Sequence, residues 1–218
     1  MKQKTLVMFD LDGTLWDSAQ AVAESWNEVF AEADATLPLL TAEDVHGVMG
    51  MTMKEISEVL QPGMDPAKRE TVFDRCCRHE VEYLYDHPGQ LYPDLEKTLQ
   101  ALQVAGYELA IVSNCQRGYV EAFLHSSGLR DYFIDYEEWE RTGKPKGENI
   151  RLVMERNGYD SAVYVGDTSK DEEAARMAGI PFVHAAYGFG KTEKPEGVIR
   201  AISALPELME KLDHKKQD

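Results

Sequence analysis

Short apolar runs alternate with longer amphipathic stretches along most of this chain. The runs have the length and composition of buried strands, and they lie at Thr5–Phe9, Glu108–Val112, Tyr132–Asp135, Ala162–Val165 and Pro181–His184. Most of them are separated by patterns of helical period, at Asp94–Ala105, Gly118–Ser127, Glu148–Asn157, Asp171–Ala178 and Val198–Leu212. Alternating strands and helices predict an α/β fold in which a Rossmann-like parallel sheet carries helices on both faces.

The stretch between Asp17 and about Asp86 interrupts this alternation with helical patterns alone. They lie at Ser18–Glu32, at Ala42–Leu60 with a break near Gly47–Gly50, and at Pro66–Tyr85. We therefore expect an inserted all-helical cap domain at residues 17–89 and a catalytic core built from residues 1–16 and 90–218. Asp17 and Gln20 fit a capping box, which predicts a helix cap at Asp17 rather than a catalytic acid.

The charge balance argues against some classes of partner. The 218 residues include 23 basic and 39 acidic side chains, a formal net charge of −16. We expect such a chain to bind neither nucleic acid nor an anionic membrane, so that a phosphorylated substrate must be held by a local cation. No apolar run approaches the length of a membrane span. The three cysteines lack metal-ligand spacing, and reduced thiols in a cytoplasmic protein are the simplest interpretation.

Two carboxylates, Asp10 and Asp12, directly follow the first apolar run. In open parallel sheets, ligands bind beyond the carboxyl ends of the strands. Two acids at this spacing repel each other unless a cation lies between them, which indicates a hard divalent metal with oxygen ligands. The pattern also suits an aspartate that acts as a covalent nucleophile. The plainer alternative is a strand followed by a polar turn.

Three later segments add polar groups at equivalent positions. Ser113 and Asn114 follow the second run, where a hydroxyl, an amide and free backbone N–H groups suit a phosphoryl oxygen, or form only a helix cap. Lys144 and Lys146 precede a predicted helix, where a cation would neutralise phosphoryl charge, although loop lysines are usually solvated. The fourth run is followed by Gly166, Asp167 and Asp171. Asp167 can complete an oxygen shell around the metal. Asp171 either supports the metal site or only stabilises a helix N-terminus.

Taken in this order, the motifs resemble those of the haloacid dehalogenase superfamily. The correspondence covers nearly the whole chain, and its four motifs are matched by Asp10, Asp12 and Thr14; by Ser113; by Lys144 or Lys146; and by Gly166, Asp167 and Asp171. The segments Leu91–Asp94 and Tyr187–Gly190 are similar to the phosphoglycolate-phosphatase-like branch, whose helical cap lies between the first two motifs. Residue counting leaves the lysine undecided, and we favour Lys146 because it lies nearer the helix start.

The resemblance implies a Mg²⁺-dependent phosphatase that acts on a small phosphorylated metabolite, as a monomer or weak homodimer. Asp10 would form an aspartyl-phosphate, and Asp12 would protonate the leaving oxygen and then activate water. Mg²⁺ would be held by Asp10, the Asp12 carbonyl and Asp167, with Asp171 as a direct or supporting residue. Ser113 and a lysine would hold the phosphoryl group, and Thr14 and Asn114 would help to bind the substrate.

The segment His46–Lys54 is the expected specificity loop of the cap, because its glycines interrupt a helix. Met51, Thr52 and Lys54 are the candidate substrate contacts, and the alternative is a helix–helix turn with methionines in the core. A phosphomutase of the β-phosphoglucomutase type would share the core motifs, and a regulatory module on the same scaffold is the non-enzymatic alternative. A dehalogenase or phosphonate-cleaving enzyme has little use for the second acid, Asp12. The motifs do not identify the leaving group.

Overall fold

The computed structural model describes residues 5–34 and 36–215, and its centre is a six-stranded parallel sheet. The strand order is β5-β4-β1-β6-β7-β8. The strands are β1 (Leu6–Phe9), β4 (Glu108–Ser113), β5 (Asp135–Glu138), β6 (Ala162–Gly166), β7 (Phe182–Ala185) and β8 (Gly197–Ile199). Because β1 pairs with β4 on one side and β6 on the other, the segments that follow these three strands meet at one edge.

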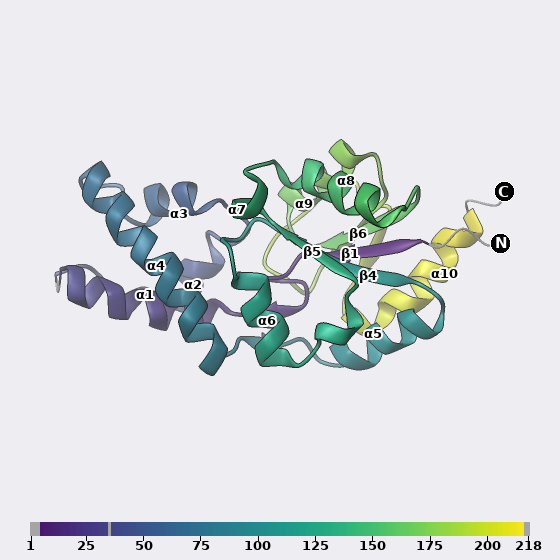
Figure 1. Cartoon of the computed structure of the whole chain (residues 1–218), viewed down its shortest axis with the longest axis horizontal. Helices are drawn as coiled ribbons and strands as arrows, with labels where there is room; N and C mark the ends of the chain where they lie inside the picture. The colour runs from purple at the N-terminus through teal and green to yellow at the C-terminus, as the bar shows by residue number, and fades with distance from the viewer. Residues whose placement is uncertain (1–4, 35, 216–218) are drawn as a thin grey trace.

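Helices cover both faces of the sheet, which confirms the predicted α/β class (Figure 1). On one face, α8 (Lys146–Asn157) and α9 (Ser169–Ala178) share a core with Leu6 and Met8 of β1. On the other, α5 (Leu95–Val104), α6 (Tyr119–Ser127) and α10 (Leu205–Lys215) share a core with Val7 and Phe9. All four β1 residues are therefore buried, as is typical of a central parallel strand.

Four helices lie together at one end of the molecule, away from the sheet (Figure 1). They are α1 (Ala19–Ala33), α2 (Ala42–His46), α3 (Met53–Leu60) and α4 (Pro66–Asp86). Their apolar side chains form a separate core, in which the Phe73 ring packs edge-on against Trp26 and Phe30 at centroid distances of 6.0 and 5.7 Å. The break expected near Gly47–Gly50 separates α2 from α3.

The two chain crossings between sheet and helices run side by side. The short strands β2 (Trp16–Asp17) and β3 (Gln90–Leu91) form an antiparallel pair, Trp16 opposite Leu91 and Asp17 opposite Gln90. The helical segment thus leaves the sheet region and returns to it through one two-stranded ribbon. The division into a core of residues 1–16 and 90–218 and a cap of residues 17–89 stays a prediction.

Three local predictions were wrong. The strand expected at Tyr132–Asp135 is β5 at Asp135–Glu138, and a 3₁₀ turn at Arg130–Tyr132 precedes it. The acidic sequence of β5 lacks the apolar pattern of a strand, and Arg156 pairs with its Asp135 and Glu137. The second error concerns the helix expected at Val198–Leu212, which begins as the edge strand β8 and continues as a 3₁₀ turn at Ile202–Ala204. The helix itself, α10, starts only at Leu205, and Pro206 lies in its first turn, where proline is tolerated.

The third error concerns the start of α1. Ser18 is its N-cap residue, and the capping box expected for Asp17 and Gln20 does not form. The Gln20 amide instead donates to Glu24, one turn further along the helix. Asp17 accepts a hydrogen bond from the Ala19 backbone N–H at 3.0 Å and contacts His46 Nε2 at 3.0 Å, so it joins the ribbon to α2.

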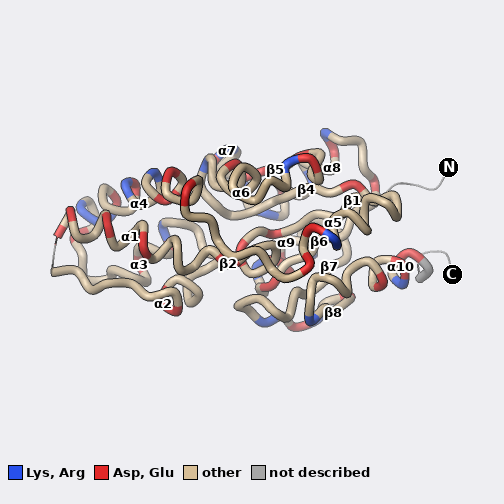
Figure 2. Tube along the Cα trace, turned by 90° about the horizontal axis from the view of Figure 1, so that it is seen from below, with Lys and Arg blue, Asp and Glu red and all other residues tan. Residues whose placement is uncertain are grey.

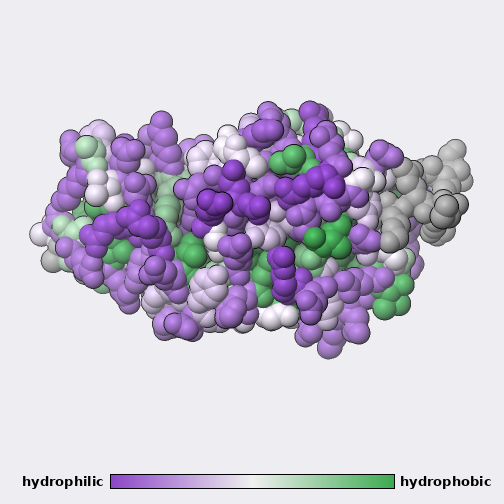
Figure 3. All heavy atoms as spheres, in the orientation of Figure 1, coloured by the Kyte–Doolittle hydropathy of each residue, from purple (hydrophilic) through white to green (hydrophobic). Residues whose placement is uncertain are grey.

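The surface shows how the charge and the apolar side chains are distributed. Acidic residues occur in both the helical end and the sheet region, with basic residues between them (Figure 2). Hydrophobic residues form small separate patches on the face seen in Figure 3. Among the described residues, no helix is both long and apolar enough to cross a membrane. The oligomeric state expected from the sequence stays a prediction.

Candidate active site

The turn after β1 is closed by its own backbone. The Asp10 N–H donates to the Val165 carbonyl of β6 at 2.8 Å, and the Leu11 carbonyl accepts from the Leu15 N–H at 2.8 Å. Gly13 has a φ of +78°, and a Cβ there would lie 2.3 Å from Asp167 Oδ2. Only glycine fits this position, because it allows the left-handed backbone and the close approach to Asp167. The turn thus fixes Asp10 and Asp12 relative to β6.

Lys146 is the cation at the centre of the site. Its Nζ donates to Asp10 Oδ1 at 2.9 Å and to Asp171 Oδ1 at 2.6 Å, and the side chain is 4% exposed. Burial alone would lower the pKa of Lys146, but the charges of Asp10 and Asp171 hold it well above its ordinary value. The ammonium is therefore charged, and it neutralises two carboxylates that would otherwise be costly to bury.

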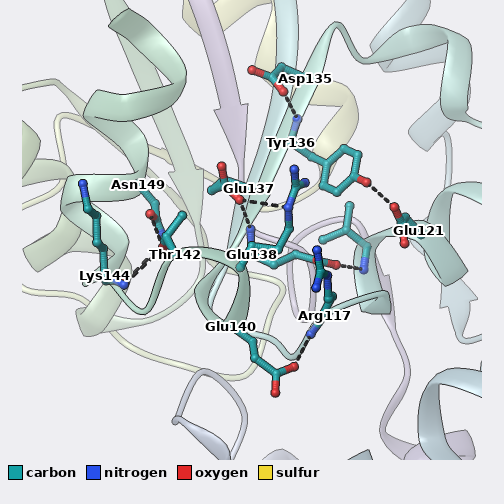
Figure 4. A network of polar contacts seen from close by, with 12 residues as sticks. Arg117, Glu121, Asp135, Tyr136, Glu137, Glu138, Glu140, Thr142, Lys144 and Asn149 are labelled. Carbon is teal, nitrogen blue, oxygen red and sulfur yellow. Dashed lines mark hydrogen bonds and ion pairs between the residues drawn. The ribbon is translucent and has the colours of Figure 1, made fainter. Parts of the chain in front are cut away.

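Lys144, the alternative from the sequence, lies outside this cluster. Its side chain is exposed, and its backbone N–H donates to Thr142 Oγ1 at 3.1 Å (Figure 4). Its carbonyl accepts from the Asn149 amide at 3.3 Å. Lys146 is the first residue of α8, and its side chain contacts Asp10 at the end of β1, whereas Lys144 lies in the preceding loop.

Asp167 and Asp171 differ in how their oxygens are used. Asp171 Oδ2 accepts from the Thr168 N–H at 3.0 Å and hydroxyl at 2.7 Å in the capping box of α9, so both of its oxygens have partners. Asp167 Oδ2 accepts from the Phe189 N–H at 2.7 Å, whereas Oδ1 is buried and has no hydrogen-bond partner in the described part of the chain. Asp171 is thus committed to Lys146 and α9, and Asp167 has a free oxygen.

Asp10, Asp167 and Asp171 form a cluster with one ligand atom from each within 4.8 Å of the others. Burial is the main cause that raises the pKa of Asp10 and of Asp167, and the neighbouring Asp171 carboxylate adds to it. An unpartnered buried oxygen among hard carboxylate donors is the arrangement that a divalent cation would satisfy. The residues present therefore fit a Mg²⁺ or similar ion.

Asp12 has partners that the sequence analysis missed. Its Oδ1 accepts from the Ser18 hydroxyl at 2.6 Å and from the Tyr119 hydroxyl at 3.0 Å. Burial raises the pKa of Asp12 to about 7, although the Ser18 hydrogen bond opposes this rise. Ser18 adjoins the first motif, but nothing in the sequence indicated Tyr119. It is brought to Asp12 by α6, whose first backbone N–H groups donate to the buried carboxylate of Glu138 (Figure 4).

A cavity of about 550 Å³ opens beside these acids and extends among the cap helices. Asp10, Asp12, Ser113 and Asn114 lie at its core end, and the Asn114 amide donates to the Gly50 carbonyl of the cap at 3.4 Å. Thr14 is fully buried and does not line this cavity; its carbonyl accepts from the Tyr187 hydroxyl at 2.8 Å. The strand-end residues are thus brought together except for the Thr14 side chain.

The expected specificity loop reaches the cavity in part. Met51 and Lys54 line it, and Met51 also packs against the helical core. Thr52 is the N-cap residue of α3, bonded in a capping box with Glu55, and is not among the lining residues. The sequence analysis missed Trp26, Glu80 and Gln116, which also line the cavity.

Comparison with known proteins gives concordant results. A family model described as haloacid dehalogenase-like hydrolase matches residues 7–185. A phosphoglycolate phosphatase of Agrobacterium fabrum is 31% identical, with 96% of this chain and 94% of the relative covered, and a plasmid-borne one of Cupriavidus necator is 30% identical, with 94% and 93% covered.

Solved structures share the fold at lower identity. A predicted phosphoglycolate phosphatase from Haemophilus somnus superposes with a TM-score of 0.83 at 23% identity, covering 96% of this chain and 99% of the other. CbbY from Rhodobacter sphaeroides, solved in complex with xylulose-1,5-bisphosphate, gives 0.77 at 17% identity, with 93% and 96% covered.

Proposed function

We propose that this chain, which belongs to the haloacid dehalogenase-like hydrolases, hydrolyses a small phosphomonoester through a phosphoryl group carried on Asp10, with Mg²⁺ as its cofactor. Its relatives identify it as a phosphoric monoester hydrolase. The observation that supports the mechanism is the position of Asp10, whose carboxylate is bonded to Lys146 and lines the cavity beside Asp12.

The two aspartates carry the bond-making and proton-transfer steps. The Asp10 carboxylate forms a bond to phosphorus while the bond from phosphorus to the ester oxygen breaks, and Asp12 gives its proton to that oxygen. Water then attacks the phosphorus, Asp12 takes a proton from the water, and the bond between Asp10 and phosphorus breaks to release phosphate. A pKa of about 7 suits Asp12 to both steps near neutral pH.

The other residues hold the phosphoryl group and the metal. Lys146 carries the positive charge next to Asp10, and Ser113 with Asn114 supplies a hydroxyl and an amide at the same end of the cavity. Asp10, Asp167 and the Asp12 carbonyl would hold Mg²⁺, which would neutralise and orient the phosphoryl oxygens. Asp171 has the supporting role, since Lys146 and Thr168 already occupy its oxygens.

Release of phosphate from p-nitrophenyl phosphate tests this proposal. We expect turnover that needs Mg²⁺, and a loss of several orders of magnitude in kcat for Asp10→Asn, because the amide cannot attack phosphorus. Lys144→Ala is the matched control, since its side chain is exposed and lies away from Asp10. Normal turnover by folded Asp10→Asn, or full activity in excess chelator, would contradict the mechanism.

No particular observation favours a phosphomutase, and the two reactions differ in product. A phosphatase releases inorganic phosphate from a sugar phosphate, whereas a mutase returns an isomeric phosphoester.

The three cysteines are free, in line with the reduced, cytoplasmic setting that we propose.

A further inference from the structure

The cavity extends far beyond the phosphoryl-binding end. Its volume of about 550 Å³ lies within the range of pockets that hold drug-sized ligands, roughly 300–1,000 Å³. A two-carbon acid such as the glycolate released by the named relatives would fill only a small part of it. If the proposed function is right, the remaining space belongs to the leaving group.

Most of the cap wall is apolar. Val22 and Trp26 of α1, Val48 and Met51 of the α2–α3 region, and Ile56 and Phe73 line the cavity. A leaving group that displaces water from such a wall gains hydrophobic free energy in proportion to the apolar area that it buries. The wall therefore favours an alkyl or aromatic body over a short polar one.

Glu80 is a buried acid in this wall. It is 3% exposed, and its Oε2 accepts from the Trp26 indole N–H at 2.6 Å. Within the described residues, neither Lys nor Arg forms an ion pair with it. Burial raises the pKa of Glu80 to about 8, and the negative charge of Asp12, which lines the same cavity, contributes. Near neutral pH the group is a neutral carboxylic acid that can donate as well as accept a hydrogen bond.

Gln116 faces the same space from the core. It is 9% exposed and lines the cavity. Its Nε2 lies close enough to Glu80 to lower the pKa of that acid. The two groups do not form a hydrogen bond of normal geometry. A buried amide N–H without a partner is costly, and a ligand oxygen beside Gln116 would satisfy it. The two side chains together are a preformed site for one polar group.

Charged groups in the cavity argue against a carboxylate at this position. Lys54 and Arg69 also line the cavity, but the Lys54 side chain is exposed, and the Arg69 guanidinium donates to the Gln61 carbonyl at 3.3 Å and lies 3.9 Å from Glu58. A carboxylate placed against Glu80 would instead be buried at a site with which, within the described residues, no lysine or arginine forms an ion pair. Burying that charge without a counter-charge would be costly, and the Glu80 carboxyl would have to keep its proton beside it.

The geometry points to Glu80 as a specificity-determining residue that, with Gln116, hydrogen-bonds an uncharged hydroxyl or carbonyl near the ester of a leaving group with a larger apolar body. The preferred substrate class is the phosphomonoester of a neutral alcohol rather than of a short hydroxy acid. This inference rests on the proposed phosphatase function. It separates the chain from its relatives named phosphoglycolate phosphatase, because the leaving group in that name carries a carboxylate, which the neutral, apolar surroundings of Glu80 disfavour.

Three esters of one two-carbon skeleton test the polar site. Ethyl phosphate, 2-hydroxyethyl phosphate and 2-phosphoglycolate end in a methyl group, a hydroxyl and a carboxylate, and benzyl phosphate adds an apolar body. We expect wild-type kcat/KM to be about tenfold or more higher for 2-hydroxyethyl phosphate than for the other two-carbon esters. Benzyl phosphate should exceed ethyl phosphate. A wild type that prefers 2-phosphoglycolate would overturn the inference while leaving the phosphatase function intact.

Variants assign the effect to Glu80. Glu80→Leu should remove the preference for 2-hydroxyethyl over ethyl phosphate while the ethyl ester is still hydrolysed, and Glu80→Gln should keep most of it. Trp26→Phe, which removes the indole N–H that donates to Glu80, together with part of the buried ring system, should weaken it in the same direction. Glu82→Leu, two residues along α4 and exposed, is the matched control. Unchanged selectivity in Glu80→Leu and Trp26→Phe would overturn the inference, and no hydrolysis of any ester by the wild type would overturn the proposed function as well.

Discussion

Glu80 should make the stability of the folded chain depend on pH. Its pKa is about 8 in the folded state, because burial disfavours the carboxylate, and 4.5 in an unperturbed glutamate. The folded state therefore holds this proton more tightly than the unfolded state does. The stabilisation is complete below pH 4.5 and is lost as the pH rises towards 8.

The size of the effect follows from these two pKa values. At about 1.4 kcal/mol per pKa unit, the loss has an upper limit of roughly 5 kcal/mol. The carboxyl group lines a cavity that water can enter, so we expect about half of that limit to be observed. For a chain of this size, a loss of about 2.5 kcal/mol lowers the melting temperature by roughly 5–10 °C.

Thermal melts of wild type and Glu80→Gln between pH 4.5 and 8.5, both in chelator, measure this loss. The glutamine keeps the shape and accepts from the Trp26 indole but does not titrate, so the two melting curves should diverge, the wild type losing stability relative to the variant as the pH rises. Glu82→Gln should instead run parallel to the wild type, because Glu82 is exposed. If Glu80→Gln also ran parallel, Glu80 would be an ordinary ionised carboxylate, and its assigned role as a neutral donor would be wrong.

Three further predictions follow from the contacts in the site. Lys146→Ala should lower kcat by about 100-fold or more, and without metal it should lower the free energy of unfolding by about 3–5 kcal/mol, because it leaves buried acids unpaired. Lys144→Ala should keep most of the activity, and the opposite pattern would assign the role to Lys144. Ca²⁺ should inhibit the Mg²⁺-supported reaction in a phosphate-release assay, since its larger and looser shell misplaces Asp10; equal support by both ions would contradict this. Lys54→Ala should leave the relative kcat/KM among neutral esters unchanged. Met51 is half-buried and lines the cavity, so Met51→Ala should lower the free energy of unfolding by about 1 kcal/mol and alter that selectivity profile. A changed profile in Lys54→Ala alone would indicate an anionic leaving group.

Errors in the sequence analysis occurred where neighbours outweighed local pattern. The acidic strand Asp135–Glu138 has little apolar character, and its pairing with β4 and the contacts of Arg156 define it as a strand. Likewise β8 is recognisable only by its pairing with β7. A short edge strand buries one side at most, so the apolar pattern that identified β1, β4 and β6 is weak there.

The sequence by itself determined the fold class and which acids lie together at the end of the sheet. Asp10, Ser113 and Asp167 each follow a continuous apolar run, and parallel strands joined by helices must place such residues at the same edge of the sheet. This inference needs only local pattern and one topological rule. That is why the cluster around Asp10 could be anticipated residue by residue, even though its members are far apart in the chain.

Only the tertiary structure decided which partners complete the site. Lys146 rather than Lys144 reaches Asp10 across 136 positions, Tyr119 reaches Asp12 across 107, and Trp26 bonds Glu80 across 54. No local pattern encodes these pairs, because each depends on how a helix is oriented against the sheet or against another helix. The acids proposed to act at the phosphoryl group therefore lie in short motifs, whereas the proposed contacts to the leaving group depend on packing between α1, α4 and the core.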